Sequence, residues 1–177
     1  VQTLNFRPYR VDLTPFAGVL DDGNPHTVAL SVFNVDNNFS VTASLLLYLD
    51  AGSTQVQGAV TMNTLGAAPT PIVTGSIGSN GTGSVSVDSN RQFTIAGYVD
   101  TSQGRVDTQI DQTFAFDTTS TYTTPSNETI LQSTTVDTTT TVTDEASAST
   151  TATQGHLSYP FSFAYAGGVI DFDQAFD

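Results

Sequence analysis

The chain has 177 residues, and its 17 acidic residues against only four basic ones give a formal net charge of −13 at pH 7. This charge argues against a nucleic-acid partner, which requires a basic patch, and against an anionic membrane surface. The sequence pI of about 4.1 suits an acidic medium, although solubility alone explains the acidity equally well. Cysteine is absent, so no disulfide framework exists.

The first predicted element is a short helical turn at Thr14–Leu20, with Thr14 as its cap and Pro15 at its first helical position. No other stretch has apolar residues at helical spacing over three turns. Period-two alternation and continuous apolar runs instead predict strands almost throughout. The predicted strands are His26–Val35, Val41–Leu49 (covered on both faces), Gln55–Met62, Arg91–Val99, Arg105–Phe116 and His156–Tyr165.

Turn residues separate these runs at the spacing of a sandwich, as in Ser102–Gly104 and Gly167–Gly168. The sequence therefore predicts an all-β fold of antiparallel sheets, a jelly roll or β-sandwich, with at most one short helical turn. Pro160 interrupts a predicted strand, which places it at a sheet edge or a bulge.

Residues 117–154 are rich in Thr and Ser, and two interpretations stand. One is a mucin-like, O-glycosylated linker. The other, which we favour because the segment keeps apolar residues, is long strands with Thr on the solvent face. We accordingly divide the chain into residues 1–116, part of a jelly-roll domain, and residues 117–177, strands that complete or extend the sandwich.

Three Asn-x-Ser/Thr sequons, at Asn38, Asn80 and Asn127, are candidate N-glycosylation sites, although a Ser/Thr-rich chain also generates such triplets by chance. No signal peptide and no apolar run long enough to cross a bilayer is recognised. Both ends of the sequence look cut, so we expect the chain to be a processed or partial product of a longer precursor.

Three motifs in the first fifty residues occur in a distinctive order. Residues 7–16 read RPYRVDLTPF, residues 22–26 read DGNPH, and residues 45–50 read LLLYLD after an alternating strand. This order resembles the peptide-N-glycosidase A family, with its Y-x-x-D-[IL]-T-P-F, D-G-x-P-H and L-x-L-W-L-D motifs. Tyr48 stands where the family often has Trp. Residues 51–155 add little to the resemblance.

The resemblance implies a jelly-roll-containing enzyme that hydrolyses the amide between N-acetylglucosamine and an asparagine side chain of an N-glycopeptide. It implies a secreted or vacuolar protein that works at acidic pH without a metal or other cofactor. It also implies a heterodimer, in which this chain is the C-terminal one and its partner is the N-terminal chain of the same precursor. The principal catalytic acid would then lie in that partner.

Amide hydrolysis needs a carboxylate that activates water and donors for the charge that develops on the carbonyl oxygen. The weak catalytic candidates of this chain are Arg7, Arg10 and Asp12, because an Arg–carboxylate pair can position a glycan or orient an acid. Tyr9 and His26 are weak substrate-binding candidates. Structural alternatives are that Asp12 caps the helical turn with Arg10 balancing it, and that His26 makes a hydrogen bond in a turn.

No metal site is predicted, because Asp171 and Asp173 lack the loop pattern of a calcium site. Two other function classes remain open beside the glycoamidase. One is a non-catalytic carbohydrate-binding or cell-surface β-sandwich module. The other is a structural surface protein with an O-glycosylated stalk.

Overall fold

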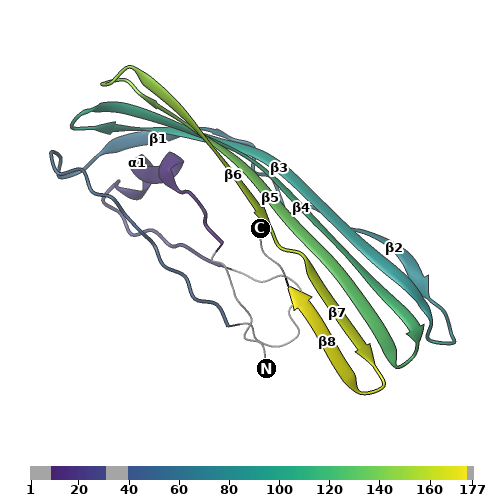
Figure 1. The fold of residues 1–177 in the computed structure, drawn as a ribbon. Helices are drawn as coiled ribbons and strands as arrows, with labels where there is room; N and C mark the ends of the chain where they lie inside the picture. Colours follow the sequence, from purple (N-terminus) through teal and green to yellow (C-terminus); the bar gives the residue numbers. More distant parts are fainter. Residues whose placement is uncertain (1–8, 31–39, 175–177) are drawn as a thin grey trace.

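The structure, a computed structural model, describes residues 9–30 and 40–174 of the chain. These residues form one antiparallel sheet of eight strands and one short helical segment, which lies on one side of the sheet (Figure 1). The prediction of an all-β antiparallel fold with at most one short helical turn is confirmed.

The sheet has the strand order β1-β3-β4-β5-β7-β8, with β2 also paired to β3 and β6 also paired to β5. The strands are β1 (Gln57–Asn63), β2 (Ile72–Ile77), β3 (Gly83–Thr101), β4 (Gly104–Thr124), β5 (Asn127–Asp144), β6 (Ser149–Ser158), β7 (Phe161–Ala166) and β8 (Val169–Gln174). Residues 117–154 are thus strands joined by tight turns, as favoured above, and the division drawn at residue 116 falls inside β4.

The three central strands are unusually long, with 19 residues in β3, 21 in β4 and 18 in β5. A rise of about 3.3 Å per residue makes β4 roughly 70 Å long. Short strands pair with different halves of these long ones, so β1 and β2 both lie along β3, and β6 and β7 both lie along β5. The sheet is therefore a long ribbon rather than a compact layer, as Figure 1 shows.

Alternation along the strands gives the sheet an apolar face and a polar face. On the apolar face Ile95, Val99, Ile110 and Val136 are buried, together with Thr108. The polar face carries Thr, Ser and Asp side chains, among them Asp111, Thr113, Asp117, Thr135, Asp137, Thr139 and Thr141. The predicted alternation in Arg105–Phe116 is confirmed, with Thr108 and Ile110 on the buried side and Gln109 exposed.

The helical segment packs on the apolar face at one end of the sheet. It comprises a 3-10 turn, η1 (Thr14–Phe16), and one turn of α-helix, α1 (Ala17–Leu20), as predicted. The prediction that Thr14 is the N-cap is wrong, because Leu13 occupies that position and Thr14 is the first residue of the 3-10 turn. Pro15 is fully buried, and Gly18 faces the backbone of Gly58 in β1.

Two predicted strands are not formed. Residues 24–30 and 40–49 have no strand pairing, and the side chains of both segments are exposed to solvent. The prediction that Val41–Leu49 is a strand covered on both faces is therefore wrong for this chain, because nothing within the described residues pairs with it or covers it. Residues 31–35 of the predicted strand His26–Val35 lie outside the described residues.

The structure agrees with the predictions for Pro160 and for the Gly167–Gly168 turn. Tyr159 exchanges both backbone hydrogen bonds with Thr134 of β5, so the nitrogen of the next residue, Pro160, points away from β5 toward the sheet edge. Gly167 and Gly168, at φ 57° and 86°, form the two-residue turn between Ala166 and Val169. Positive φ at both turn positions is the geometry that a tight hairpin favours.

We predict that Gly97→Ala destabilises the protein, because the new Cβ would overlap the carbonyl oxygen of the buried Pro15. Backbone of this kind cannot move away as a flexible side chain would, so the expected loss is about 1–3 kcal/mol in the free energy of unfolding, measured in urea. Gly155→Ala in β6 is the matched control, because nothing lies within 4 Å of its Cβ position. Equal stability of the two variants would contradict the prediction.

Candidate functional site

The candidate residues near the start of the chain do not gather into one site. Arg7 and Asn38 lie outside the described residues. Arg10 is exposed and makes no ion pair or hydrogen bond with any described residue. By contrast, Arg91 donates to the carbonyls of Gly66 and Ala67, at the loop between β1 and β2.

Asp12 has a structural role at the start of the helical segment. Its Oδ1 accepts hydrogen bonds from the backbone N–H of Thr14 at 2.9 Å and from the Thr14 hydroxyl at 2.6 Å. This arrangement satisfies an N–H group that the first helical turn leaves without an intrahelical partner. Asp12 therefore orders the entry into the helix, and it makes no ion pair with Arg10.

Tyr9 reaches the apolar face of the sheet. Its hydroxyl donates to Oε1 of Gln112 in β4 over 3.5 Å, and Nε2 of Gln112 donates to the Thr138 hydroxyl in β5 at 3.0 Å. Burial raises the pKa of the Tyr9 phenol, and the nearby Tyr159 adds to the shift. The ring is still 51% exposed, so one side of Tyr9 remains available to a ligand.

His26 belongs to a turn, which agrees with its structural alternative. Its Nε2 lies 2.8 Å from Oδ1 of Asp22, and the same oxygen accepts the backbone N–H of Asn24 at 2.8 Å. The Asn24 N–H and then His26 lower the pKa of Asp22. The His26–Asp22 pair thus closes the Asp22–His26 turn.

The two described sequons occupy different surroundings. Asn80 is exposed in the turn between β2 and β3, and its Oδ1 accepts hydrogen bonds from the backbone N–H and the hydroxyl of Thr82. Asn127 is half-buried at the first position of β5. Only Asn80 therefore presents its side chain on an open turn.

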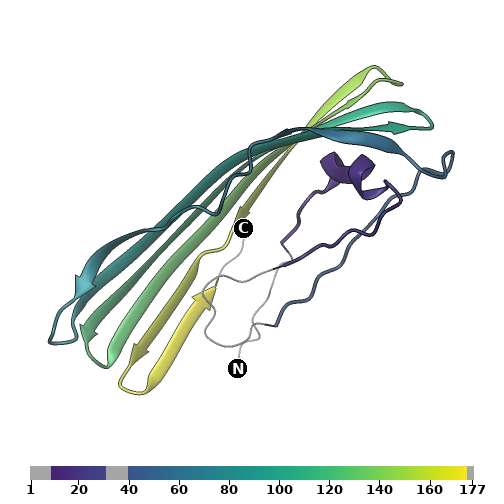
Figure 2. The same ribbon diagram turned by 180° about the vertical axis from the view of Figure 1, so that it is seen from behind.

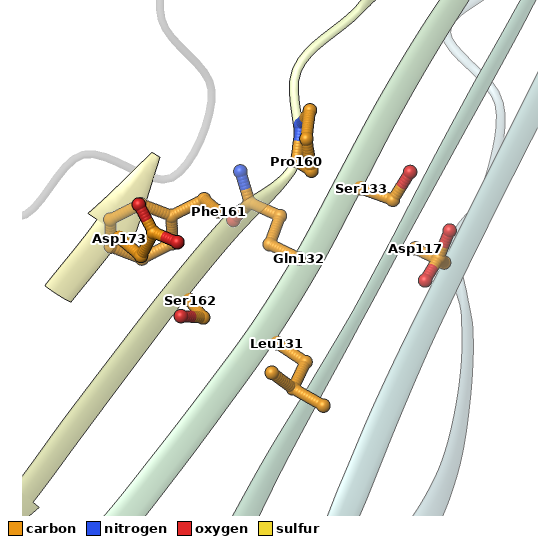
Figure 3. Close-up of a pocket in the computed structure, with 8 residues that line it drawn as sticks. All are labelled: Asp117, Leu131, Gln132, Ser133, Pro160, Phe161, Ser162 and Asp173. Atoms are coloured by element: carbon orange, nitrogen blue, oxygen red, sulfur yellow. The ribbon is translucent and has the colours of Figure 1, made fainter. Parts of the chain in front are cut away.

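A shallow pocket of about 270 Å³ lies on the polar face, between β4, β5, β7 and β8 (Figure 3). It is lined by Asp117, Leu131, Gln132, Ser133, Pro160, Phe161, Ser162 and Asp173. Asp117 of β4 is paired with Ser133 of β5. Two residues along β5, Leu131 is paired with Ser162 of β7, which in turn is paired with Asp173 of β8. All five side chains therefore lie on the same face of the sheet. The pocket thus places two carboxylates and two hydroxyls beside the apolar side chains of Leu131, Pro160 and Phe161.

The chemistry available in this pocket is hydrogen bonding rather than amide cleavage. No Arg or His lines it, so it lacks a cationic donor for charge developing on a carbonyl oxygen. The sequence did not predict this site. Asp117 and Asp173 are 56 residues apart and meet only through the register of four strands, which alternation alone does not specify.

Two further polar arrangements are structural. Asp50 accepts hydrogen bonds from the backbone N–H of Ser102 at 2.6 Å and from the Gly52 N–H at 2.9 Å, which ties the segment before β1 to the turn after β3. Within the sheet, Arg105 stacks over the Tyr98 ring at 3.7 Å from its centroid and pairs with Asp107 at 2.8 Å.

Neither a metal site nor a membrane-spanning helix is found in the part of the chain that the structure describes. No three His, Cys, Asp or Glu side chains among residues 9–30 and 40–174 are grouped so that they could hold a metal ion. The described helical residues contain no helix long and apolar enough to cross a membrane.

Comparison with known proteins gives one partial relative. The chain is 31% identical over 108 residues to peptide-N4-(N-acetyl-beta-glucosaminyl)asparagine amidase A of Prunus dulcis. The match covers 61% of this chain and 19% of that protein, so the chain spans about a fifth of the relative's length. No family model matches the sequence, and no solved structure matches it. The chain is therefore related to part of an amidase.

We predict that the Asp50 carboxylate stabilises the fold in a pH-dependent way. The hydrogen bonds from the Ser102 hydroxyl, the Ser102 N–H and the Gly52 N–H lower the pKa of Asp50 below its ordinary value of 3.8. A lowered carboxyl pKa stabilises the folded state above the unfolded pKa, and this contribution is lost as the pH falls through the folded pKa.

Asp50→Ala should therefore lower the thermal midpoint at neutral pH, and its difference from the wild type should narrow below about pH 3.8. Asp117→Ala is the control, because Asp117 is exposed and its carboxylate makes no hydrogen bond to another described residue. Thermal denaturation followed at several pH values tests this. A pH-independent offset for Asp50→Ala would contradict the prediction.

Proposed function

We propose that this chain is part of a secreted glycoamidase that hydrolyses the amide between N-acetylglucosamine and asparagine in N-glycopeptides. The observation that carries the proposal is the 31% identity over 108 residues to an amidase whose name specifies this bond. In the reaction, water attacks the side-chain carbonyl carbon and the C–N bond breaks. The peptide keeps an aspartate, and the sugar leaves as a glycosylamine.

The described residues support a non-catalytic part for this chain within such an enzyme. Asp12 is engaged at the helix start and His26 in a turn, and neither of them lines the polar-face pocket. Arg10, Tyr9 and the polar-face pocket remain as groups that could contact a glycan. We therefore assign the catalytic acid to the N-terminal chain of the same precursor.

We predict that the complete precursor product, but not residues 1–177 alone, converts an N-glycopeptide into its aspartate form at mildly acidic pH. The physical reason is that this chain lacks a carboxylate aligned with a donor of positive charge in its pocket. Mass spectrometry of the peptide measures the conversion, with a non-glycosylated asparagine peptide as control. Failure of the complete product to convert the glycopeptide would refute the glycoamidase proposal.

The alternative function is a carbohydrate-binding module without catalysis. The pocket favours it, because carboxylates and serine hydroxyls can hydrogen-bond sugar hydroxyls but offer no cation for catalysis. Saturable binding of the glycopeptide without conversion by the complete product would support this alternative. The O-glycosylated linker that a stalk would need is not seen, since residues 117–154 form strands.

Secretion, which is part of the proposal, makes a separate prediction about Asn80. Expressed through a eukaryotic secretory pathway, the chain should carry an N-glycan on Asn80, because this side chain lies exposed on a turn that leaves room for a bulky group. Asn80→Gln should remove one glycan from the intact mass. Asn127→Gln, at a half-buried strand start, is the matched comparison. An unglycosylated secreted wild-type chain would refute the prediction.

A further inference from the structure

Residues 40–49 form an exposed apolar segment on the outside of the molecule. Leu46 is 81% exposed, Leu47 65% and Tyr48 98%, and Val41, Leu45 and Leu49 are exposed as well. Figures 1 and 2 show the segment running extended on the far side of the helical layer, away from the sheet. Contiguous apolar surface of this kind marks an interaction site rather than ordinary solvent-facing chain.

The backbone of this segment is open as well. Residues 40–49 belong to no strand, and no described residue makes a backbone hydrogen bond with them. The extended residues 24–30 are likewise unpaired, and Val28 and Leu30 in them are exposed. The segment thus presents apolar side chains together with N–H and C=O groups that no described residue pairs with, which is what an unpaired strand offers to an added strand.

The sequence of the segment is that of a strand buried on both faces. The continuous run Leu45–Leu49 is typical of such strands, whereas a strand with one solvent face alternates apolar and polar residues. Residues 9–30 and 40–174 supply neither the neighbouring strand nor the cover that such a segment needs.

We propose that residues 40–49 accept a β-strand from polypeptide sequence outside these 177 residues. The added strand would pair with the open backbone and bring apolar side chains to cover Leu46, Leu47 and Tyr48. The inference rests on the exposed segment and does not depend on amidase activity.

Two observations favour this occupant over a second copy of the chain. Each copy carries a charge of −13 with only four basic residues, so two copies repel each other and an added strand should be neutral or basic. The matched amidase is also about five times as long as the matched region, so a protein of that kind has much further sequence from which a strand can come.

Photo-crosslinking in the complete gene product, made in its own host, tests the proposal. A photoreactive phenylalanine analogue replaces Tyr48, and in a control variant it replaces Leu131. Leu131 is also an exposed apolar residue, at 56%, but its backbone already lies between Thr119 on one side and Ser162 on the other. The expected result is one cross-linked peptide from position 48, with a strand-like sequence from outside the 177 residues, and none from position 131.

Leu47→Asp should then reduce the yield at position 48 by about 10- to 100-fold, the range expected for losing one buried leucine, while Leu131→Asp should not change it. Amide hydrogen exchange of residues 40–49 should also be slower in the complete product than in the isolated chain. The same measurement on each isolated variant checks that it still folds. Slow exchange of the backbone amides in β3, β4 and β5 shows that the sheet is formed.

Four outcomes would overturn the proposal. The first is cross-linking of position 48 to another segment of the same 177 residues, without a dimer mass. The second is cross-linking of position 48 to a second copy of the chain, accompanied by a dimer mass. The third is cross-linking to unrelated proteins with no common sequence. The fourth is no cross-link together with fast exchange of residues 40–49 in the complete product. Glycopeptide conversion is scored separately, so each proposal can fail without the other.

Discussion

The contact between the Pro15 turn and the glycines of the sheet fixes how the covering layer sits on the fold. Gly58 and Gly97 leave no side chain between the sheet and the helical segment, so the Pro15 carbonyl and Gly18 approach the strand backbones directly. Pro15 is then fully buried over the apolar face, where Ile95 and Val99 are also buried. Close backbone approach of this kind is available only to glycine.

The other attachments of the layer follow from this contact. Asp21 lies directly after the helix and accepts a hydrogen bond from the backbone N–H of Val56 at 2.6 Å. This bond fixes the start of β1 against the end of the helix. Asp50 holds the Ser102 turn between β3 and β4, and Tyr9 reaches Gln112 in β4. Asp21 and Asp50 act at the end of the sheet that the helix covers, whereas Tyr9 contacts Gln112 further along β4. None of these contacts involves residues 40–49.

The sequence predicted which face of a strand each residue occupies, because alternation within the strand controls this. It did not predict which strands pair or in what register. Arg105–Phe116 was predicted correctly because each residue's face depends only on its own strand, and the Pro15 turn because its signals are local. Val41–Leu49 was predicted as a covered strand because its composition is that of one, but composition does not say which polypeptide supplies the neighbour. The pocket between Asp117 and Asp173 depends on register over four strands. The structural role of Asp12 at the helix start, by contrast, agrees with the local alternative that the sequence offered.

Several aspartates of this acidic chain are held as carboxylates by local hydrogen-bond donors. Hydrogen bonds from Thr94 and Gln109 lower the pKa of Asp111, the Arg105 guanidinium lowers that of Asp107, and the Ser147 hydroxyl lowers that of Asp144. Each of these contributions to stability is fully present above the ordinary carboxyl pKa and is lost as the pH falls through the lowered one. Local donors at a few aspartates thus stabilise the long sheet at neutral pH, where the described residues bury only a small apolar core.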